Sequence, residues 1–305
     1  MSVVQKLVSA LMILSPWLLL QGVLAEDGAD EGRSLDIRAP GSDLANFPNS
    51  AFTLPKGGFY VEMAPASYTG SSSTLSAQYN WEYLLRYGLT DRIELRLYSP
   101  GFSVQQSPNA ATGFSPLTFD TKIHFWDENQ AFWLPAAGLE VLLQTEILGS
   151  SAFNAGLEPS FSVNFDQSLP YELQFEYNLG AARFENPSNI EQSIWDFTFS
   201  WAIQREIVED VDFFVNGYTN AANLPRIGRV SDQSSRRCPR SNRVCREQDL
   251  IKDITQQGGN NSQHMLGVGG LWTVSDQTSL FANLAGGLNA RTPDFFGYVG
   301  FAWTP

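Results

Sequence analysis

The chain has 305 residues, a formal net charge of −13 and 13% aromatic residues. The acidic balance argues against a nucleic-acid partner, because binding a phosphate backbone requires a basic surface. The 21 Phe, 10 Tyr and 8 Trp are more than two small cores require. They suit a protein that covers an apolar belt with aromatic side chains.

The first 25 residues predict a secretory signal peptide. Lys6 precedes the apolar run 7–20, and Val23-Leu24-Ala25 precedes an abruptly acidic stretch. Small residues at this place predict cleavage after Ala25. A membrane-anchor helix is the alternative, but the apolar run is short for one. After Ala25 no segment approaches the roughly 18 uncharged apolar residues of a spanning helix, so a membrane would be crossed by strands.

Residues 26–53 predict a flexible acidic periplasmic leader. The segment contains six acids, two Arg, several Gly and Pro, and no apolar period. Such a composition buries too little apolar surface to offset the entropy lost on ordering.

From residue 54 onward the chain predicts twelve strands. The clearest is 194–203, in which Trp195, Phe197, Phe199 and Trp201 alternate with polar residues such as Asp196. The period of two indicates a strand with one apolar and one polar face. The twelve ranges are 58–66, 75–87, 92–98, 115–126, 131–145, 155–165, 171–184, 194–203, 211–219, 264–274, 278–289 and 295–303.

The connections distinguish a soluble sandwich from a membrane barrel. Tight turns rich in Asp, Asn, Ser and Gly alternate with the longer or more irregular connections 67–74, 100–113, 147–154, 185–191, 221–263 and 290–294. Outer-membrane barrels alternate short periplasmic turns with longer outer loops, whereas a sandwich has no reason to do so. We therefore expect residues 54–305 to form an all-β, antiparallel transmembrane barrel of about twelve strands in the outer membrane of a Gram-negative-type cell. A long outer loop is expected at 221–263, and the pattern is also compatible with ten or fourteen strands.

Two segments carry a resemblance to a known family. YGLTDRIELRLYSPGF (87–102) and LGVGGLWTVSDQTSLFANLAGGLNARTPDFFGYVGFAW (266–303) resemble an outer-membrane family described as meta-pathway phenol-degradation transporters. The resemblance covers 54–303 and implies a barrel that takes up hydrophobic or aromatic compounds. The C-terminus departs from the family pattern. The family resembles other outer-membrane barrels, which end on an aromatic residue that the assembly machinery recognises. This chain ends Trp303-Thr304-Pro305.

The polar faces of the predicted strands point into the lumen. We expect nine acids and three bases to line it. They are Glu62, Glu82, Arg86, Glu94, Arg96, Asp120, Lys122, Glu140, Glu172, Glu176, Asp196 and Asp212. An excess of carboxylates in a confined pore favours cations or neutral polar solutes over anions. The alternative is a cross-strand network of ion pairs that fills the interior.

The long connection holds the only two cysteines. An oxidising compartment favours a disulfide between Cys238 and Cys245. A metal site is not expected, since the two cysteines have no nearby third ligand. The surrounding arginines could bind lipopolysaccharide phosphates or fold inward as a plug against the acidic lumen. The alternative is a solvated loop without a binding role. These arginines are Arg236, Arg237, Arg240, Arg243 and Arg246.

We expect no enzyme and no cofactor. The only histidines are His124 and His264, and Ser262 beside His264 belongs to no known catalytic motif. The sequence thus predicts a channel or transporter for small molecules, with outer-membrane lipid, a solute and the assembly machinery as partners. The alternative is a non-transporting structural or surface-interaction barrel whose outer loops bind a partner. The oligomeric state stays open.

Overall fold

The computed structural model describes residues 35–72, 76–107, 110–153, 156–186, 189–220 and 263–305, and for 184–186 and 189–194 it describes the backbone alone. The predicted signal peptide, the first part of the leader, and Cys238, Cys245 and the arginines around them lie outside the described residues. No helix in these ranges is long and apolar enough to cross a membrane.

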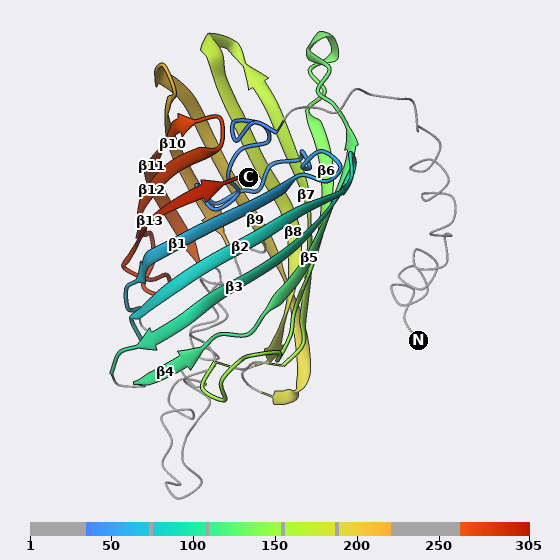
Figure 1. Cartoon of the computed structure of the whole chain (residues 1–305). Helices are drawn as coiled ribbons and strands as arrows, with labels where there is room; N and C mark the ends of the chain where they lie inside the picture. The colour runs from blue at the N-terminus through green and yellow to red at the C-terminus, as the bar shows by residue number, and fades with distance from the viewer. Residues whose placement is uncertain (1–34, 73–75, 108–109, 154–155, 187–188, 221–262) are drawn as a thin grey trace, which may run out of the picture. The chain divides into compact units, whose positions relative to one another are not determined.

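The described residues form a closed antiparallel β-barrel (Figure 1). Closure is made by β1, which pairs with β2 on one side and with the last strand, β13, on the other. The thirteen strands are β1 (Phe59–Thr69), β2 (Gln78–Thr90), β3 (Ile93–Gln105), β4 (Ala111–Phe114), β5 (Thr118–Trp126), β6 (Ala136–Gln144), β7 (Glu158–Leu169), β8 (Leu173–Asn186), β9 (Asn189–Val208), β10 (Val211–Thr219), β11 (His264–Ser275), β12 (Thr278–Gly287) and β13 (Phe295–Trp303). Since β4 pairs with β3 alone, twelve strands make the barrel wall, as predicted.

Strand β3 is shared between two partners. Its first half pairs with β5 through residues 93–98, and its second half pairs with β4 through residues 102–105. A β-bulge in β3 places both Gly101 and Phe102 opposite Trp81 of β2. Gly101 has φ +64°, and a Cβ there would lie 2.0 Å from the carbonyl oxygen of Trp81, so glycine is required at this position.

Two of the predicted connections are wrong. The predicted loop 100–113 consists largely of the second half of β3 and of β4, and most of the predicted loop 185–191 belongs to β8 and β9, which pair as far as Asn186 and Asn189. Strand β9 therefore spans 20 residues and not the ten of 194–203. Outside the lipid layer, a strand needs no apolar face, so the alternation of apolar and polar residues can end while the hydrogen bonds between strands continue. The sequence pattern therefore underestimates strand length.

The barrel has an apolar exterior and a polar interior. Along β2, Tyr79, Trp81 and Tyr87 are exposed, while Glu82 and Arg86 are buried on the opposite face. On β9, Trp195 and Phe197 are 55% and 57% exposed, as the period of two predicts. The exposed aromatic side chains face outward, where lipid would cover them.

The connections at one end of the barrel include two 3-10 helices. These are η1 (Gln130–Phe132), between β5 and β6, and η2 (Pro170–Glu172), between β7 and β8. The same end holds the β11–β12 turn, where Ile37 donates to the carbonyl oxygen of Asp276 and Thr304 donates to that of Gln277. Both the described N-terminal residues and the C-terminus thus lie at this end (Figure 1).

Residues 35–54, which we name the luminal segment, lie inside the barrel. Ile37, Leu44, Phe47 and Leu54 are at most 2% exposed and belong to the buried core together with side chains of the barrel wall. The prediction of a flexible leader is therefore wrong for residues 35–53. The interior of the barrel supplies the partners that composition alone does not reveal.

The luminal segment ends in close contact with β2. Gly57 donates to the carbonyl oxygen of Gly88, and Gly88 donates to that of Gly58. A Cβ on Gly88 would lie 2.0 Å from the carbonyl oxygen of Pro55. Glycine at position 88 is thus what allows the segment to approach the wall before it continues into β1.

Candidate solute passage and its luminal segment

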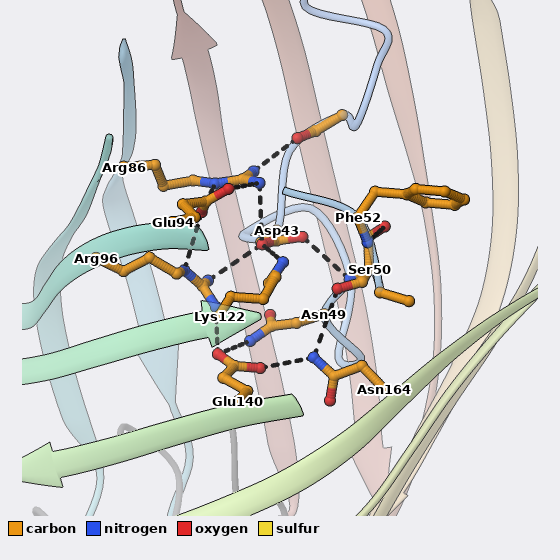
Figure 2. A network of polar contacts seen from close by, with 12 residues as sticks. Asp43, Asn49, Ser50, Phe52, Arg86, Glu94, Arg96, Lys122, Glu140 and Asn164 are labelled. Atoms are coloured by element: carbon orange, nitrogen blue, oxygen red, sulfur yellow. Dashed lines mark hydrogen bonds and ion pairs between the residues drawn. The ribbon is translucent and has the colours of Figure 1, made fainter. Parts of the chain in front are cut away.

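Three cations of the barrel wall converge on one carboxylate of the luminal segment (Figure 2). Asp43 Oδ2 lies 2.6 Å from Lys122 Nζ, 3.2 Å from Arg96 Nη2 and 3.4 Å from Arg86 Nη2. Arg86 comes from β2, Arg96 from β3 and Lys122 from β5. Because these strands are neighbours and the three residues point inward, their registers bring the charges to one place.

The same cations are held by carboxylates of the wall. Arg86 lies 2.6 Å from Glu94 and 2.9 Å from Glu62, and Arg96 lies 3.0 Å from Asp120 and also contacts Glu140. Each guanidinium therefore joins two or more strands to the luminal segment. Buried charges are tolerated when they are paired and hydrogen-bonded in this way.

The position of Asp43 affects its own ionisation. Burial raises the pKa of this carboxyl, but the charges of Arg86, Lys122 and Arg96 outweigh burial and hold its pKa well below the ordinary value. Asp43 is consequently ionised at neutral pH and anchors the luminal segment as an anion.

Wall side chains also replace the sheet partners that the backbone of the luminal segment lacks. Glu62 accepts from the Leu44 amide at 2.8 Å and Glu94 accepts from the Leu54 amide at 2.8 Å. Asn178 accepts from the Asn49 amide at 2.7 Å and donates to its carbonyl oxygen at 2.8 Å. An irregular segment can be buried in the lumen because its polar groups are satisfied individually.

An aromatic contact fixes the middle of the segment. Phe47 is fully buried, with its ring centroid 5.0 Å from Tyr218 in an edge-to-face arrangement and 5.9 Å from Phe296. Tyr298 donates from its hydroxyl to the carbonyl oxygen of Ala45 at 2.7 Å. These contacts come from β10 and β13, not from β2, β3 and β5, which carry the three cations.

The luminal segment does not fill the interior. A cavity of about 240 Å³ lies between it and β8–β11. Glu176, Gln204, Asp212, Phe214 and Leu271 line the cavity on the barrel side, and Asp43 and Asn46 line it on the side of the luminal segment.

One exposed cation holds the start of the luminal segment. The Arg38 guanidinium lies 2.8 Å from Asp276 of the β11–β12 turn, 2.8 Å from Asp210 of the β9–β10 turn and 3.2 Å from Asp36. Hydrogen bonds to Asp276 and Asp210 raise the pKa of Arg38 above its ordinary value. The contact closes one side of the mouth of the cavity, which both Arg38 and Asp210 line.

The comparisons with known proteins agree with this architecture. The model of the family described as "Putative MetA-pathway of phenol degradation" matches residues 42–232. The chain belongs to this phenol-degradation family. The matched range includes the resemblance at 87–102 but not the one at 266–303, and it begins within the luminal segment, next to Asp43.

One solved structure shares the fold of this family member, and two others show weaker similarity. An outer-membrane channel of Pseudomonas putida F1, the COG4313 channel, is 12% identical with a TM-score of 0.51, covering 85% of this chain and 99% of that one. The NanC porin is 8% identical with a TM-score of 0.45, covering 81% and 99%. Omp33 of Acinetobacter baumannii is 8% identical with a TM-score of 0.36, covering 81% and 98%. No curated protein is similar enough to the sequence to count as a relative. The chain has the fold of an outer-membrane β-barrel.

Of the twelve predicted lumen residues, eleven face the interior in this phenol-degradation family member. Eight of them are buried in the ion-paired interior: Glu62, Glu82, Arg86, Glu94, Arg96, Asp120, Lys122 and Glu140. Glu82 there accepts hydrogen bonds from Ser67 and Tyr98. On this side, the alternative of a network of ion pairs describes the geometry.

The remaining four residues behave differently. Glu176 and Asp212 line the cavity, and Asp196 accepts a hydrogen bond from the side-chain Nδ2 of Asn220 at 3.1 Å. Glu172 does not line the lumen. It belongs to η2, its side chain is 84% exposed, and it pairs with Arg205. The prediction was wrong because the turn occupies residues 170–172, and β8 begins after it.

The described histidines have structural partners. His124 Nδ1 lies 3.0 Å from the carbonyl oxygen of Ala51, and its ring stacks on Phe52 at 5.1 Å. His264 Nδ1 lies 2.9 Å from Thr219 Oγ1. In the ranges that the structure describes, neither imidazole forms a hydrogen bond with a serine hydroxyl.

Sequence reasoning missed Asp43, Asn46, Asn49 and the other luminal-segment residues of this family member. One signal was present, since Leu35, Ile37, Leu44 and Phe47 are apolar residues in a segment that is otherwise acidic and rich in Gly and Pro. Their spacing follows neither the period of a helix nor that of a strand. A segment with side-chain partners in place of regular structure gives no periodic pattern.

Proposed function

We propose that this protein is an outer-membrane channel through which small molecules enter the periplasm, with hydrophobic or aromatic compounds as the substrate class that the family description suggests. The observation that carries the proposal is the incompletely filled lumen. The luminal segment is anchored to β2, β3 and β5 on one side and leaves a cavity of about 240 Å³ against β8–β11 on the other. Binding sites in barrels occur where the wall and the interior segments leave such a space.

The proposed route is the cavity side, because the opposite side is closed by buried ion pairs. The carboxylates in the cavity favour cations and neutral polar solutes over anions. Catalysis is not part of the proposal.

Liposome swelling tests the proposal. Purified wild-type protein reconstituted in liposomes should admit small neutral sugars and small aromatic solutes faster than protein-free liposomes do. A variant that lacks residues 35–53 should admit them faster still. Absence of swelling with both proteins, each inserted and folded as judged by heat-modifiable gel migration, would contradict a channel and favour the non-transporting barrel.

We also propose the remaining features of the topology. Residues 1–25 would be cleaved as a signal peptide, and residues 221–263 would form the long outer loop. In that loop, a disulfide between Cys238 and Cys245 and arginines facing lipopolysaccharide phosphates follow from the oxidising compartment and from charge. Protease added to intact cells should cleave within 221–263. The mass of alkylated protein with and without reductant tests the disulfide.

A further inference from the structure

The cavity has an unequal balance of charge. Its lining includes five carboxylates and one guanidinium, and two of the carboxylates have cationic partners, since Asp43 pairs with the wall cations and Asp210 pairs with Arg38. The other three form no ion pair with any cation in the described part of the chain. These three are Glu176, Glu206 and Asp212.

Two of these carboxylates oppose each other directly. Asp212 of β10 and Glu206 of β9 are register partners in the antiparallel ladder. Like charges directly opposite each other on neighbouring strands destabilise a sheet, and the described residues supply no cation between them. A cationic ligand in the cavity would remove this repulsion.

A buried amide gives an independent indication of the ligand's chemistry. Asn46 is 4% exposed, lines the cavity and donates from Nδ2 to Glu176 Oε2 at 3.0 Å. Its Oδ1 is buried without a hydrogen-bond partner among the described residues. Buried polar atoms are almost always paired, so an unpartnered acceptor beside carboxylates calls for a donor.

Apolar side chains complete the lining. Phe214 and Ile37 are each 1% exposed, and Leu271 packs against the buried core that includes Ile37. We propose that the cavity binds a small organic ammonium ion, whose N–H groups reach Asn46 Oδ1 and the carboxylates of Glu206 and Asp212 while its apolar group contacts Phe214 and Leu271. This inference rests on the proposed channel function and names the class of solute that its cavity selects.

The ligand class follows from charge and hydrogen bonding together. A carboxylate or phosphate ligand would be repelled by the unpaired carboxylates and would offer no donor to Asn46 Oδ1. A neutral alcohol would supply one donor without compensating the charge of Glu206 and Asp212. An ammonium ion supplies both a donor and a positive charge, and it is attracted by the half-buried Asp212 and by the more exposed Glu206.

Isothermal titration calorimetry of the full-length protein in detergent tests the site with three matched probes. 2-Phenylethylammonium, 2-phenylethanol and phenylacetate share a ring and differ in charge. We expect the ammonium to bind at least about tenfold more tightly than the alcohol, with no detectable binding of the carboxylate. Equal affinity for ammonium and alcohol, or preference for the carboxylate, would overturn the inference.

Variants locate the site. The double variant Glu206→Gln, Asp212→Asn should weaken ammonium binding by about tenfold or more, while Glu209→Gln, an exposed turn residue outside the cavity lining, should not. Unchanged binding in the folded double variant would place the ligand elsewhere. If the double variant does not fold, the comparison of the three probes on wild type still decides the ligand class.

The two proposals fail separately. If neutral sugars swell liposomes but the ammonium shows no preference, the channel stands and the ammonium site is wrong. If the ammonium binds selectively but no solute swells the liposomes, the site stands and the channel function is wrong.

Discussion

The two sides of the lumen hold the luminal segment by different means. Toward β2, β3 and β5, Asp43 meets Arg86, Arg96 and Lys122 in a fully buried cluster. Toward β8–β11, the segment faces a cavity in which Glu206 and Asp212 have no cationic partner among the described residues. Anchoring and solute binding are thus assigned to opposite sides of one interior, because a side held by buried ion pairs cannot open without exposing those charges.

Deleting residues 35–53 removes the luminal segment from both sides of the lumen. We expect this deletion to change the conductance of the barrel more than any substitution below. Without the segment, both sides of the lumen become accessible to water. We expect single-channel conductance in planar bilayers to rise severalfold above wild type. Glu209→Gln serves as the control, and an unchanged conductance in a deletion variant that still shows heat-modifiable migration would refute the role of the segment as an obstruction.

Asp43→Asn weakens the anchored side alone. It removes the carboxylate that pairs with Lys122 at 2.6 Å, the one ion pair of Lys122 within the described residues. Breaking a buried pair costs about 3–5 kcal/mol. Hydrogen–deuterium exchange of the backbone amides in residues 41–54 should accelerate strongly, and brief openings should appear in bilayer recordings. Exchange rates like those of wild type would show that Asp43 is not an anchor.

The contribution of Asp43 should depend on pH in one direction. Its folded-state pKa is lowered from an ordinary value of 3.8, so its stabilisation is present above that value and is lost as the pH falls toward the folded-state pKa. The difference in exchange between wild type and Asp43→Asn should be constant from about pH 7 to about pH 5 and should narrow below about pH 4. A difference that disappeared between pH 7 and pH 5 would assign the effect to another group.

Phe47→Ala tests the aromatic contact of the luminal segment with β10 and β13, which does not involve the ion pairs. Truncating a fully buried phenylalanine costs about 3 kcal/mol or more. We expect faster exchange around residue 47, with the amides near Asp43 less affected because the ion pairs remain. Phe47→Leu is the matched variant and should have a smaller effect, since it keeps most of the apolar volume. Equal effects of the two substitutions would contradict a packing role.

Arg38→Ala should have the smallest effect. Its partners Asp36, Asp210 and Asp276 are exposed to solvent, and exposed ion pairs contribute little and are screened by salt. Exchange of residues 36–40 should increase at low ionic strength, and the difference from wild type should vanish in high salt. A difference that persisted in high salt would mean that Arg38 stabilises the segment by packing and not by charge.

The barrel wall could be predicted from sequence because each strand carries its own evidence. Trp195 and Phe197 face outward and Thr198 and Ser200 face inward, as the period of two requires, and no distant contact is needed to deduce it. The boundaries were less predictable. Glu172 was assigned to the lumen because Pro170 marks the turn but does not show that the turn extends to residue 172. Strand β9 was predicted too short because the alternation of apolar and polar residues ends before the strand pairing does.

The sequence by itself determined an antiparallel barrel of about twelve strands, because an apolar exterior and a polar interior alternate along every strand. The same alternation placed most of the carboxylates and Arg86, Arg96 and Lys122 on the inward face. Only the tertiary structure decided what those charges do. Asp43 is remote in sequence from Arg96 and Lys122, and their side chains meet only when β3 and β5 have paired and the luminal segment lies against them. The structure likewise decided that residues 35–54 are ordered and that a cavity remains beside them, because both depend on contacts with several strands at once.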